Sequence, residues 1–239
     1  MRVATIARVT CLRRLSVLFV VPLLLALATG CGEDDSSKTP KAEKSQCEYN
    51  STGDAAKPAD PPPGNPPKDA PTEVVVATDR GDVKVSLDPD KAPCTVNSFL
   101  SLAKQGYFDD TKCHRLTAQG LFVLQCGDPS ATGSGGPGYA FDDELVEDDP
   151  RLQPCQADPA GGPAVCTYPA GTLAMANAGP GTNGSQFFLV YKDSPLPAAY
   201  TVFGRMSAAG LKAVQSVAAK GVQPGTETPK QPVTITSVK

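Results

Sequence analysis

Apolar and polar residues alternate most clearly around residue 80. Apolar residues 74–76 precede the turn-forming residues 79–82, and Val83, Val85 and Leu87 are then apolar at every second position. Two such runs separated by a turn predict a β-hairpin. Six later apolar runs predict further strands at 113–118, 121–126, 171–177, 186–191, 201–206 and 231–238.

Two segments have the spacing of helices. Apolar residues recur at helical intervals between Val96 and Ala103, where Thr95 is the expected N-cap and Gly106 the expected stop. A second helix is expected around 208–219. Eight short strands, two helices and no βαβ alternation predict an α+β or barrel domain over residues 73–239.

Residues 1–30 have the pattern of a signal peptide. Four arginines precede an apolar run from Leu15 to Leu27, which is shorter than the roughly 20 residues of a membrane span. The run ends in Leu-Ala-Thr-Gly-Cys, which resembles a bacterial lipobox. We therefore expect a lipid on Cys31 and a protein anchored at the extracytoplasmic face of a bacterial membrane. An ordinary secretory signal and an uncleaved anchor are the alternatives.

Residues 31–72 are expected to form a disordered linker after the lipidated cysteine. Eight prolines lie there among charged and small residues, with almost nothing apolar. Such a segment cannot offset the entropy of ordering by burying surface.

Composition excludes several functional classes. The chain has 22 Lys+Arg against 25 Asp+Glu, so nothing suggests a nucleic-acid partner. Its one histidine, His114, rules out a zinc site with several imidazoles. A G-x-G-x-x-G match at 133–138 leads into an acidic loop instead of a helix, which argues against dinucleotide binding. No cofactor or metal is expected.

Three motifs carry a specific signal. They are Cys-His-Arg with Gln-Cys-Gly-Asp within 113–128, Met-Ala-Asn-Ala-Gly-Pro-Gly-Thr-Asn-Gly-Ser-Gln-Phe-Phe within 172–188, and Val-Phe-Gly at 202–204. In this order they resemble the cyclophilin family of peptidyl-prolyl cis-trans isomerases. The resemblance implies a mainly β fold, a closed eight-stranded antiparallel β-barrel capped by two α-helices. It also implies prolyl isomerase activity without a cofactor, here on proline-containing exported polypeptides and by a monomer.

The resemblance also assigns roles to residues. Arg115 would be the catalytic arginine beside the prolyl nitrogen, Gln125 would bond the substrate backbone, and Asn177 would hold the residue before proline through its main chain. The other expected substrate-binding residues are Phe122, Val123, Ala176, Gln186, Phe188, Leu196 and Tyr200. His114 is expected to form structural hydrogen bonds and not to act as an acid or base.

The chain departs from the family pattern near this site. The segment between Arg115 and Phe122 is two residues longer than usual, and Val123 replaces a methionine. Leu196 replaces a tryptophan, which puts tight cyclosporin binding in doubt, and Tyr200 replaces a histidine. No role is predicted for an insertion around 142–168. A module of this fold that binds proline peptides with little turnover is the alternative function.

Six cysteines remain after the leader and the lipidated residue are set aside. An even number in an exported protein indicates disulfides. Cys155 and Cys166 bracket much of the insertion, and Cys113 and Cys126 lie at the open ends of the predicted hairpin. Cys47 would then pair with Cys94, with Cys94–Cys113 as an alternative. Zinc is the rival interpretation, but no C-x₂-C pair occurs.

Overall fold

The computed structural model describes residues 46–239, which belong to one packed unit. Cys31 and the expected signal peptide lie outside the described residues. The helices are α1 (Pro93–Lys104) and α2 (Ala208–Ala218). The strands are β1 (Asn50–Ser51), β2 (Glu73–Thr78), β3 (Val83–Leu87), β4 (Thr111–Lys112), β5 (Arg115–Leu116), β6 (Val123–Cys126), β7 (Tyr139–Ala140), β8 (Cys155–Gln156), β9 (Val165–Tyr168), β10 (Thr172–Met175), β11 (Phe187–Val190), β12 (Ser194–Pro197), β13 (Val202–Met206) and β14 (Thr234–Val238).

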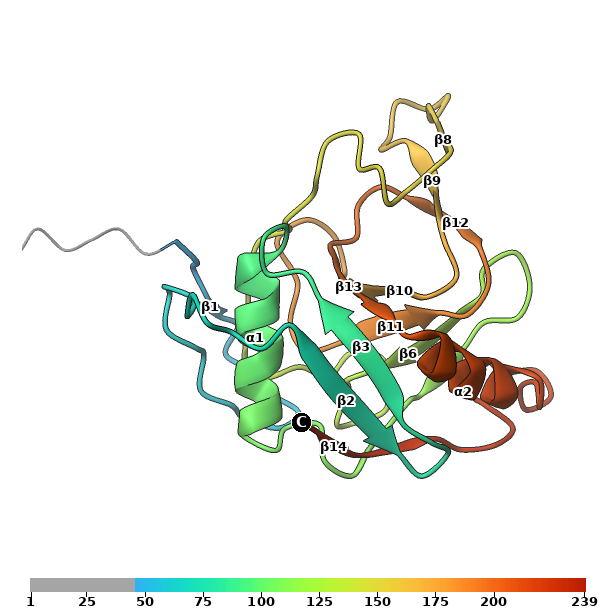
Figure 1. Ribbon diagram of the computed structural model, residues 1–239, viewed down its shortest axis with the longest axis horizontal. Coiled ribbons are helices and arrows are strands. Elements are labelled where there is room, and N and C mark those ends of the chain that lie inside the picture. Colours follow the sequence, from blue (N-terminus) through green and yellow to red (C-terminus); the bar gives the residue numbers. More distant parts are fainter. Residues whose placement is uncertain (1–45) are drawn as a thin grey trace, which may run out of the picture. The chain divides into compact units, whose positions relative to one another are not determined.

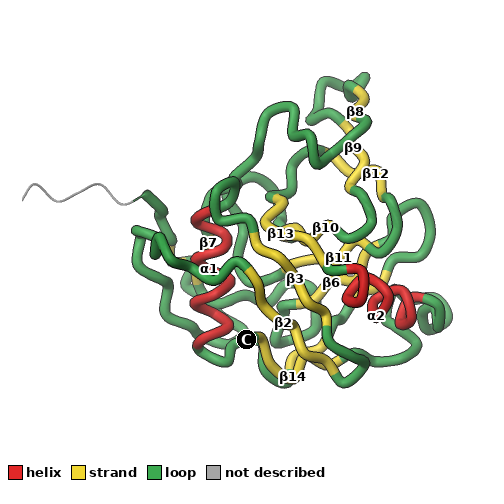
Figure 2. Tube along the Cα trace, viewed as in Figure 1, coloured by secondary structure: helices red, strands yellow, loops and turns green. Residues whose placement is uncertain are grey.

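The main sheet is antiparallel and curls between the two helices, which flank it in Figures 1 and 2. Its nine strands follow the order β4-β14-β2-β3-β13-β10-β11-β6-β5. The predicted hairpin is its β2–β3 pair, in which Val83, Val85 and Leu87 are buried while the residues between them are exposed. The turn closes where the Thr78 hydroxyl donates to the carbonyl of Gly81, whose positive φ suits glycine.

The predicted mainly β fold with two helices is confirmed, whereas a closed eight-stranded barrel is not shown. The sheet has nine strands and is open between its edge strands β4 and β5, each only two residues long. Both edges belong to one short segment, 111–116, which pairs with β14 at its start and with β6 at its end. β4 and β5 do not pair with each other, and the sheet is a curled half-barrel whose two edges both lie on this segment.

Two apolar clusters lie on the two faces of the central strands. Side chains alternate along β11, so Phe187 and Leu189 enter the main core while Phe188 and Val190 enter a second cluster. All four residues of the strand are buried. The second cluster is completed by Leu152, Cys166 and Tyr168 of the insertion. The insertion therefore covers the outer face of the sheet.

The insertion also forms a small sheet together with β12, in the order β12-β9-β8. Cys155 and Cys166 are directly opposite each other in its β8–β9 hairpin and form a disulfide. Strand β12 pairs along β9, with Leu196 opposite Cys166. In Figure 1 these strands stand above the main sheet, away from α2.

The predicted linker disorder is wrong for residues 46–72, which we call the N-terminal arm. Cys47 is disulfide-bonded to Cys94 at the start of α1, and β1 pairs with β7. The Asn97 side chain donates to the Pro63 carbonyl, which fixes the arm against the helix. Composition suggested disorder because the arm has few apolar residues, but a disulfide and main-chain hydrogen bonds hold it in place.

All three disulfides follow the preferred sequence pairing, and the Cys94–Cys113 alternative is excluded. The bonded pairs are Cys47–Cys94, Cys113–Cys126 and Cys155–Cys166. Helix α1 begins at Pro93, two residues before the predicted N-cap, Thr95. Its first N–H groups are capped from a distance, because the Glu144 carboxylate accepts from the N–H groups of Cys94 and Thr95 and from the Thr95 hydroxyl.

Candidate active site

The β5–β6 hairpin brings two candidate polar residues to one cavity. Arg115 and Gln125 are cross-strand partners, so their side chains leave the same face of the sheet. They border a cavity of about 150 Å³. Its lining residues are Arg115, Leu121, Val123, Gln125, Ala176, Asn177, Phe188, Leu196 and Tyr200. The structure thus brings together all the sequence-predicted site residues except Phe122 and Gln186.

Two side chains, those of Glu227 and Gln125, hold the guanidinium of Arg115 in place. Its Nε lies 2.5 Å from the Glu227 carboxylate, and its Nη1 donates to Oε1 of Gln125 at 3.3 Å. Glu227 lies in the loop between α2 and β14, and its carbonyl also accepts from the Leu116 N–H. The Arg115 side chain is 40% exposed, so its remaining donors can reach a ligand in the cavity.

A chain of amide side chains extends from the arginine. Nε2 of Gln125 donates to Oε1 of Gln186 at 2.8 Å, and Nε2 of Gln186 donates to the carbonyls of Gly133 and Gly135 at 3.0 Å. Gln186 therefore lies behind Gln125 and outside the cavity that holds Arg115. Its position fixes the Gln125 amide, because each amide group has a defined partner.

The apolar wall of the cavity is made of aromatic and aliphatic side chains. The ring of Tyr200 meets the ring of Phe188 edge to face, with centroids 5.6 Å apart. Tyr168 of the insertion lies behind both rings, with centroids 6.4 Å away. Val123 and Leu196 complete this side. The result is a cavity with an apolar wall on one side and a cation at its border.

The expected placement of Phe122 in the cavity is wrong. Side chains alternate along a strand, so Leu121, Val123 and Gln125 share the cavity face and Phe122 points the other way. Its ring packs on Tyr191 with centroids 5.9 Å apart, and Nζ of Lys192 lies 4.4 Å from the ring centre. Counting back from Gln125 in steps of two would have identified Leu121.

The Asn177 side chain is engaged in holding its own loop. Its Nδ2 donates to the Ala199 carbonyl at 2.9 Å and to Asp143 at 3.2 Å, while its Oδ1 accepts from the Gly179 N–H. Asp143 also accepts from Nδ2 of Asn183. Only the main chain of Asn177 is then left to meet a ligand, as the predicted role requires.

His114 does not make the structural hydrogen bonds expected of it. Both ring nitrogens are buried without a partner among the described residues. Burial lowers the pKa of His114 and the neighbouring Arg115 cation acts in the same direction, while Asp128 opposes them. Burial would raise the pKa of Asp128, but hydrogen bonds from Ser130 and the loop N–H groups lower it overall. A neutral imidazole therefore lies beside the site without contacting the cavity.

A larger groove continues from this cavity. It has a volume of about 520 Å³ and shares Gln125, Ala176 and Asn177 with the cavity. Its walls come from residues 133–140, from the loop before β11 and from the N-terminal arm. Ligand chains longer than a single residue can therefore extend from the cavity along the surface.

The family model "Cyclophilin type peptidyl-prolyl cis-trans isomerase/CLD" matches residues 73–239, the range that contains the main sheet and the Arg115–Gln125 pair. The chain belongs to the cyclophilin family. The "Probable peptidyl-prolyl cis-trans isomerase B" of Mycobacterium leprae is 48% identical to this cyclophilin over 204 residues, 81% of this chain and 66% of the relative. The protein of the same name from Mycobacterium tuberculosis is 49% identical over 203 residues, 80% of this chain and 63% of the relative. This cyclophilin thus spans just under two thirds of the length of both relatives.

Solved structures give the same result for the fold. A cyclophilin-type isomerase of Cryptosporidium parvum is 28% identical, with a TM-score of 0.55, and the match covers 70% of this chain and 95% of that one. A second structure, described as obtained in the presence of the dipeptide Ala-Pro, is 29% identical, with the same TM-score and coverage of 70% and 96%.

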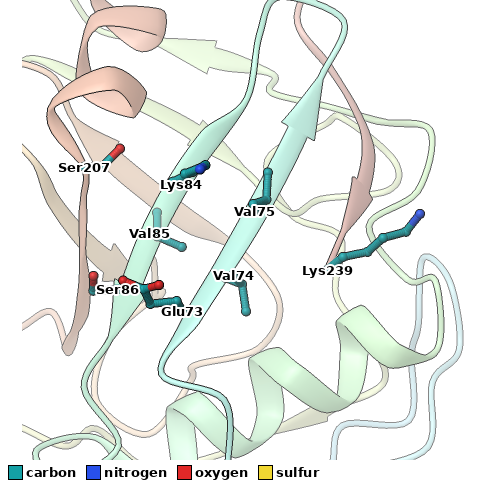
Figure 3. Close-up of a pocket in the computed structure, with 8 residues that line it drawn as sticks. All are labelled: Glu73, Val74, Val75, Lys84, Val85, Ser86, Ser207 and Lys239. Carbon is teal, nitrogen blue, oxygen red and sulfur yellow. The ribbon is translucent and has the colours of Figure 1, made fainter.

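Another cavity of this cyclophilin lies elsewhere on the sheet. It measures about 310 Å³, follows the β2–β3 hairpin and has no residue in common with the Arg115 cavity (Figure 3). Within residues 46–239, no group of three or more His, Cys, Asp or Glu is placed to hold a metal ion. No helix in the described part of the chain is long and apolar enough to cross a membrane.

Proposed function

We propose that this chain is a peptidyl-prolyl cis-trans isomerase that acts without a covalent intermediate. The observation that carries the proposal is one guanidinium at the border of a cavity that has an apolar, aromatic wall. Arg115 supplies the charge, and Gln125 beside it supplies a fixed amide. The Ala-Pro dipeptide named with the Cryptosporidium cyclophilin supports a proline-containing ligand here.

The reaction needs only non-covalent groups of this kind. Rotating a prolyl amide breaks its resonance against a barrier of about 18–20 kcal/mol, and the spontaneous exchange takes tens to hundreds of seconds. A catalyst must hold the ring, grip the neighbouring peptide and stabilise a nitrogen whose lone pair has become localised. A fixed cation in a partly desolvated site does the last of these, because it interacts more strongly with the twisted amide than with the planar one.

The cavity offers a residue for each of these three requirements. Val123, Phe188 and Leu196 would contact the proline ring. The guanidinium of Arg115 would donate toward the prolyl nitrogen, and the Gln125 amide would bond the substrate main chain. The main chain of Asn177 would hold the residue before proline.

Arg115→Ala tests this function directly. A proline-exchange assay on a short peptide should show a loss of about 10²–10³ in kcat/KM, the usual effect of removing one preorganised donor. Arg115→Lys should remain impaired, because an ammonium group cannot bond Glu227 and Gln125 from one rigid plane. Arg80→Ala, in the exposed turn after β2, is the matched control and should retain activity. Equal rates for wild type and Arg115→Ala would overturn the proposal.

A binding module with little turnover is the second candidate. The close ion pair with Glu227 favours it, because this carboxylate offsets part of the charge on Arg115. Binding without turnover would appear as peptide affinity in titration calorimetry combined with an exchange rate equal to the spontaneous one.

We further propose that the protein is exported, lipidated on Cys31 and acts as a monomer on exported polypeptides. The lipobox-like sequence and the three disulfides support this, because disulfides persist in oxidising compartments. Metabolic labelling with a fatty acid should mark the wild type, while Cys31→Ala should remain unlabelled. An unlabelled wild-type protein would contradict the lipid anchor, and size-exclusion chromatography tests the monomer.

A further inference from the structure

The N-terminal arm contributes directly to the groove beside the proposed proline cavity. Thr52 and Asp54 line the groove together with loop residues 133–140. Hydrogen bonds on either side of Asp54 fix its backbone, because the Thr52 N–H donates to the Gly138 carbonyl and the Ala56 N–H donates to the Gly136 carbonyl, both at 3.0 Å. Asp54 is therefore held at the rim by main-chain contacts.

Asp54 is the one charged residue among those that line this groove; the others are neutral. The Asp54 carboxylate forms no ion pair within residues 46–239, and Asp54 is exposed to solvent. The arm's nearby lysine, Lys57, does not neutralise it, because Nζ of Lys57 donates to the carbonyls of Gly106 and Tyr107. The carboxylate is thus available to a ligand.

The surroundings of the groove add negative charge. Asp128 is fully buried beneath the 130–135 loop, and Asp143 holds the loop that follows Asn177. The cation of Arg115 borders the neighbouring cavity and is paired with Glu227. A cationic side chain in the groove would meet an unpaired carboxylate, whereas an anionic one would be repelled.

We propose that Asp54 makes this protein select proline peptides that carry lysine or arginine shortly before the proline. This inference rests on the proposed isomerase function, which places the residue before proline at Asn177. The groove begins at Asn177 and Ala176 and leads away from the apolar cavity. The second and third residues before proline would then pass along it, within reach of Asp54.

The proposal is tested with three peptides that differ only at the second residue before proline. This residue is lysine, alanine or glutamate. Because an exposed ion pair contributes little, kcat/KM should be about 2- to 10-fold higher for the lysine peptide than for the glutamate peptide. Asp54→Asn should remove most of this preference, so that the lysine and glutamate peptides are turned over at similar rates. Asp60→Asn makes the same charge change elsewhere on the arm, outside the groove lining, and should keep the preference. About 1 M salt should suppress the wild-type preference.

The outcomes separate the two proposals. Equal turnover of the lysine and glutamate peptides by the wild type, or a preference unchanged in Asp54→Asn, overturns the role of Asp54 and leaves the isomerase intact. A preference for the lysine peptide in binding, together with no exchange above the spontaneous rate for any of the three peptides, supports the acidic groove and contradicts the enzyme. Neither binding nor turnover of any peptide overturns both.

Discussion

Arg115 is held by a carboxylate from a distant part of the chain. Glu227 lies 112 residues further on and contacts Nε, while Gln125 contacts Nη1. We predict that Glu227→Ala lowers kcat/KM by about tenfold, because a mobile guanidinium is placed correctly for only part of the time. The Glu227 carbonyl would still accept from Leu116, so the loop should keep its position.

Two further variants, measured in the same proline-exchange assay, show whether the Glu227 carboxylate positions Arg115. Glu227→Gln keeps an oxygen that accepts from Nε and should retain most of the activity. Glu73→Ala, an exposed glutamate in β2, should behave as the wild type. An activity increase in Glu227→Ala would mean that the carboxylate weakens Arg115 instead of positioning it.

His114 makes the stability of the fold depend on pH. Burial lowers its pKa below the ordinary value of 6.5, so the unfolded chain takes up the proton first as the pH falls. The stability that the neutral His114 side chain contributes to the fold is fully present above about pH 6.5 and is lost progressively as the pH falls below it. Urea unfolding at pH 7 and at pH 5 should show that the free energy of unfolding falls more between these pH values in the wild type than in His114→Gln. An equal loss in both would assign the dependence to other groups.

At the residue scale, the sequence identified the polar centre of the site but not all of its surroundings. Arg115 and Gln125, which the family resemblance assigned to the site, fall on cross-strand partners of one hairpin. Phe122 was misplaced because a motif gives residue types and not the face of the strand. Glu227 could not be found, since it contacts the site only through a loop of irregular structure.

At the scale of elements, helix α1 depends on a capping residue outside the helix. Glu144 accepts from the N–H groups of Cys94 and Thr95 and from the Thr95 hydroxyl. We predict that Glu144→Ala lowers the free energy of unfolding by about 0.5–2 kcal/mol, the cost of losing a helix cap. Chemical denaturation measures it, with the exposed Glu147→Ala as control. Equal losses in the two variants would contradict the capping role.

The regular elements were predictable because their patterns are local. The β2–β3 hairpin and both helices lie where the apolar spacing placed them. The arrangement of the two sheet edges was not predictable, because it depends on how the short segment 111–116 divides its pairing between β14 and β6, which are far apart in the chain. The first turn of α1 was also missed, since Glu144 is 49 residues from Thr95.

At the scale of the whole molecule, two added segments flank the site and each carries a disulfide. The insertion covers the outer face of the sheet and supports Leu196 through β9. The N-terminal arm follows the 136–140 loop and reaches the groove. Composition described the arm correctly as poor in apolar residues, but it could not reveal the main-chain partners that the rest of the fold offers.

The Cys47–Cys94 disulfide is expected to keep the arm in register with the groove. It joins residues 47 positions apart, so the chain-entropy model assigns it about 4 kcal/mol. We predict that the double variant Cys47→Ser/Cys94→Ser unfolds at lower urea concentration. Its arm amides at Thr52, Ala56 and Ala59 should also exchange hydrogen faster, because their carbonyl partners in the 136–138 loop are lost more often.

The matched control is Cys155→Ser/Cys166→Ser, which removes a disulfide of the insertion and leaves the arm untouched. Its arm amides should stay protected even though its overall stability falls. If Asp54 acts through a fixed arm, the preference for lysine over glutamate peptides should weaken in the Cys47/Cys94 variant and persist in the control. Unchanged exchange in the Cys47/Cys94 variant would mean that the β1–β7 pairing and the Asn97–Pro63 contact hold the arm without the disulfide.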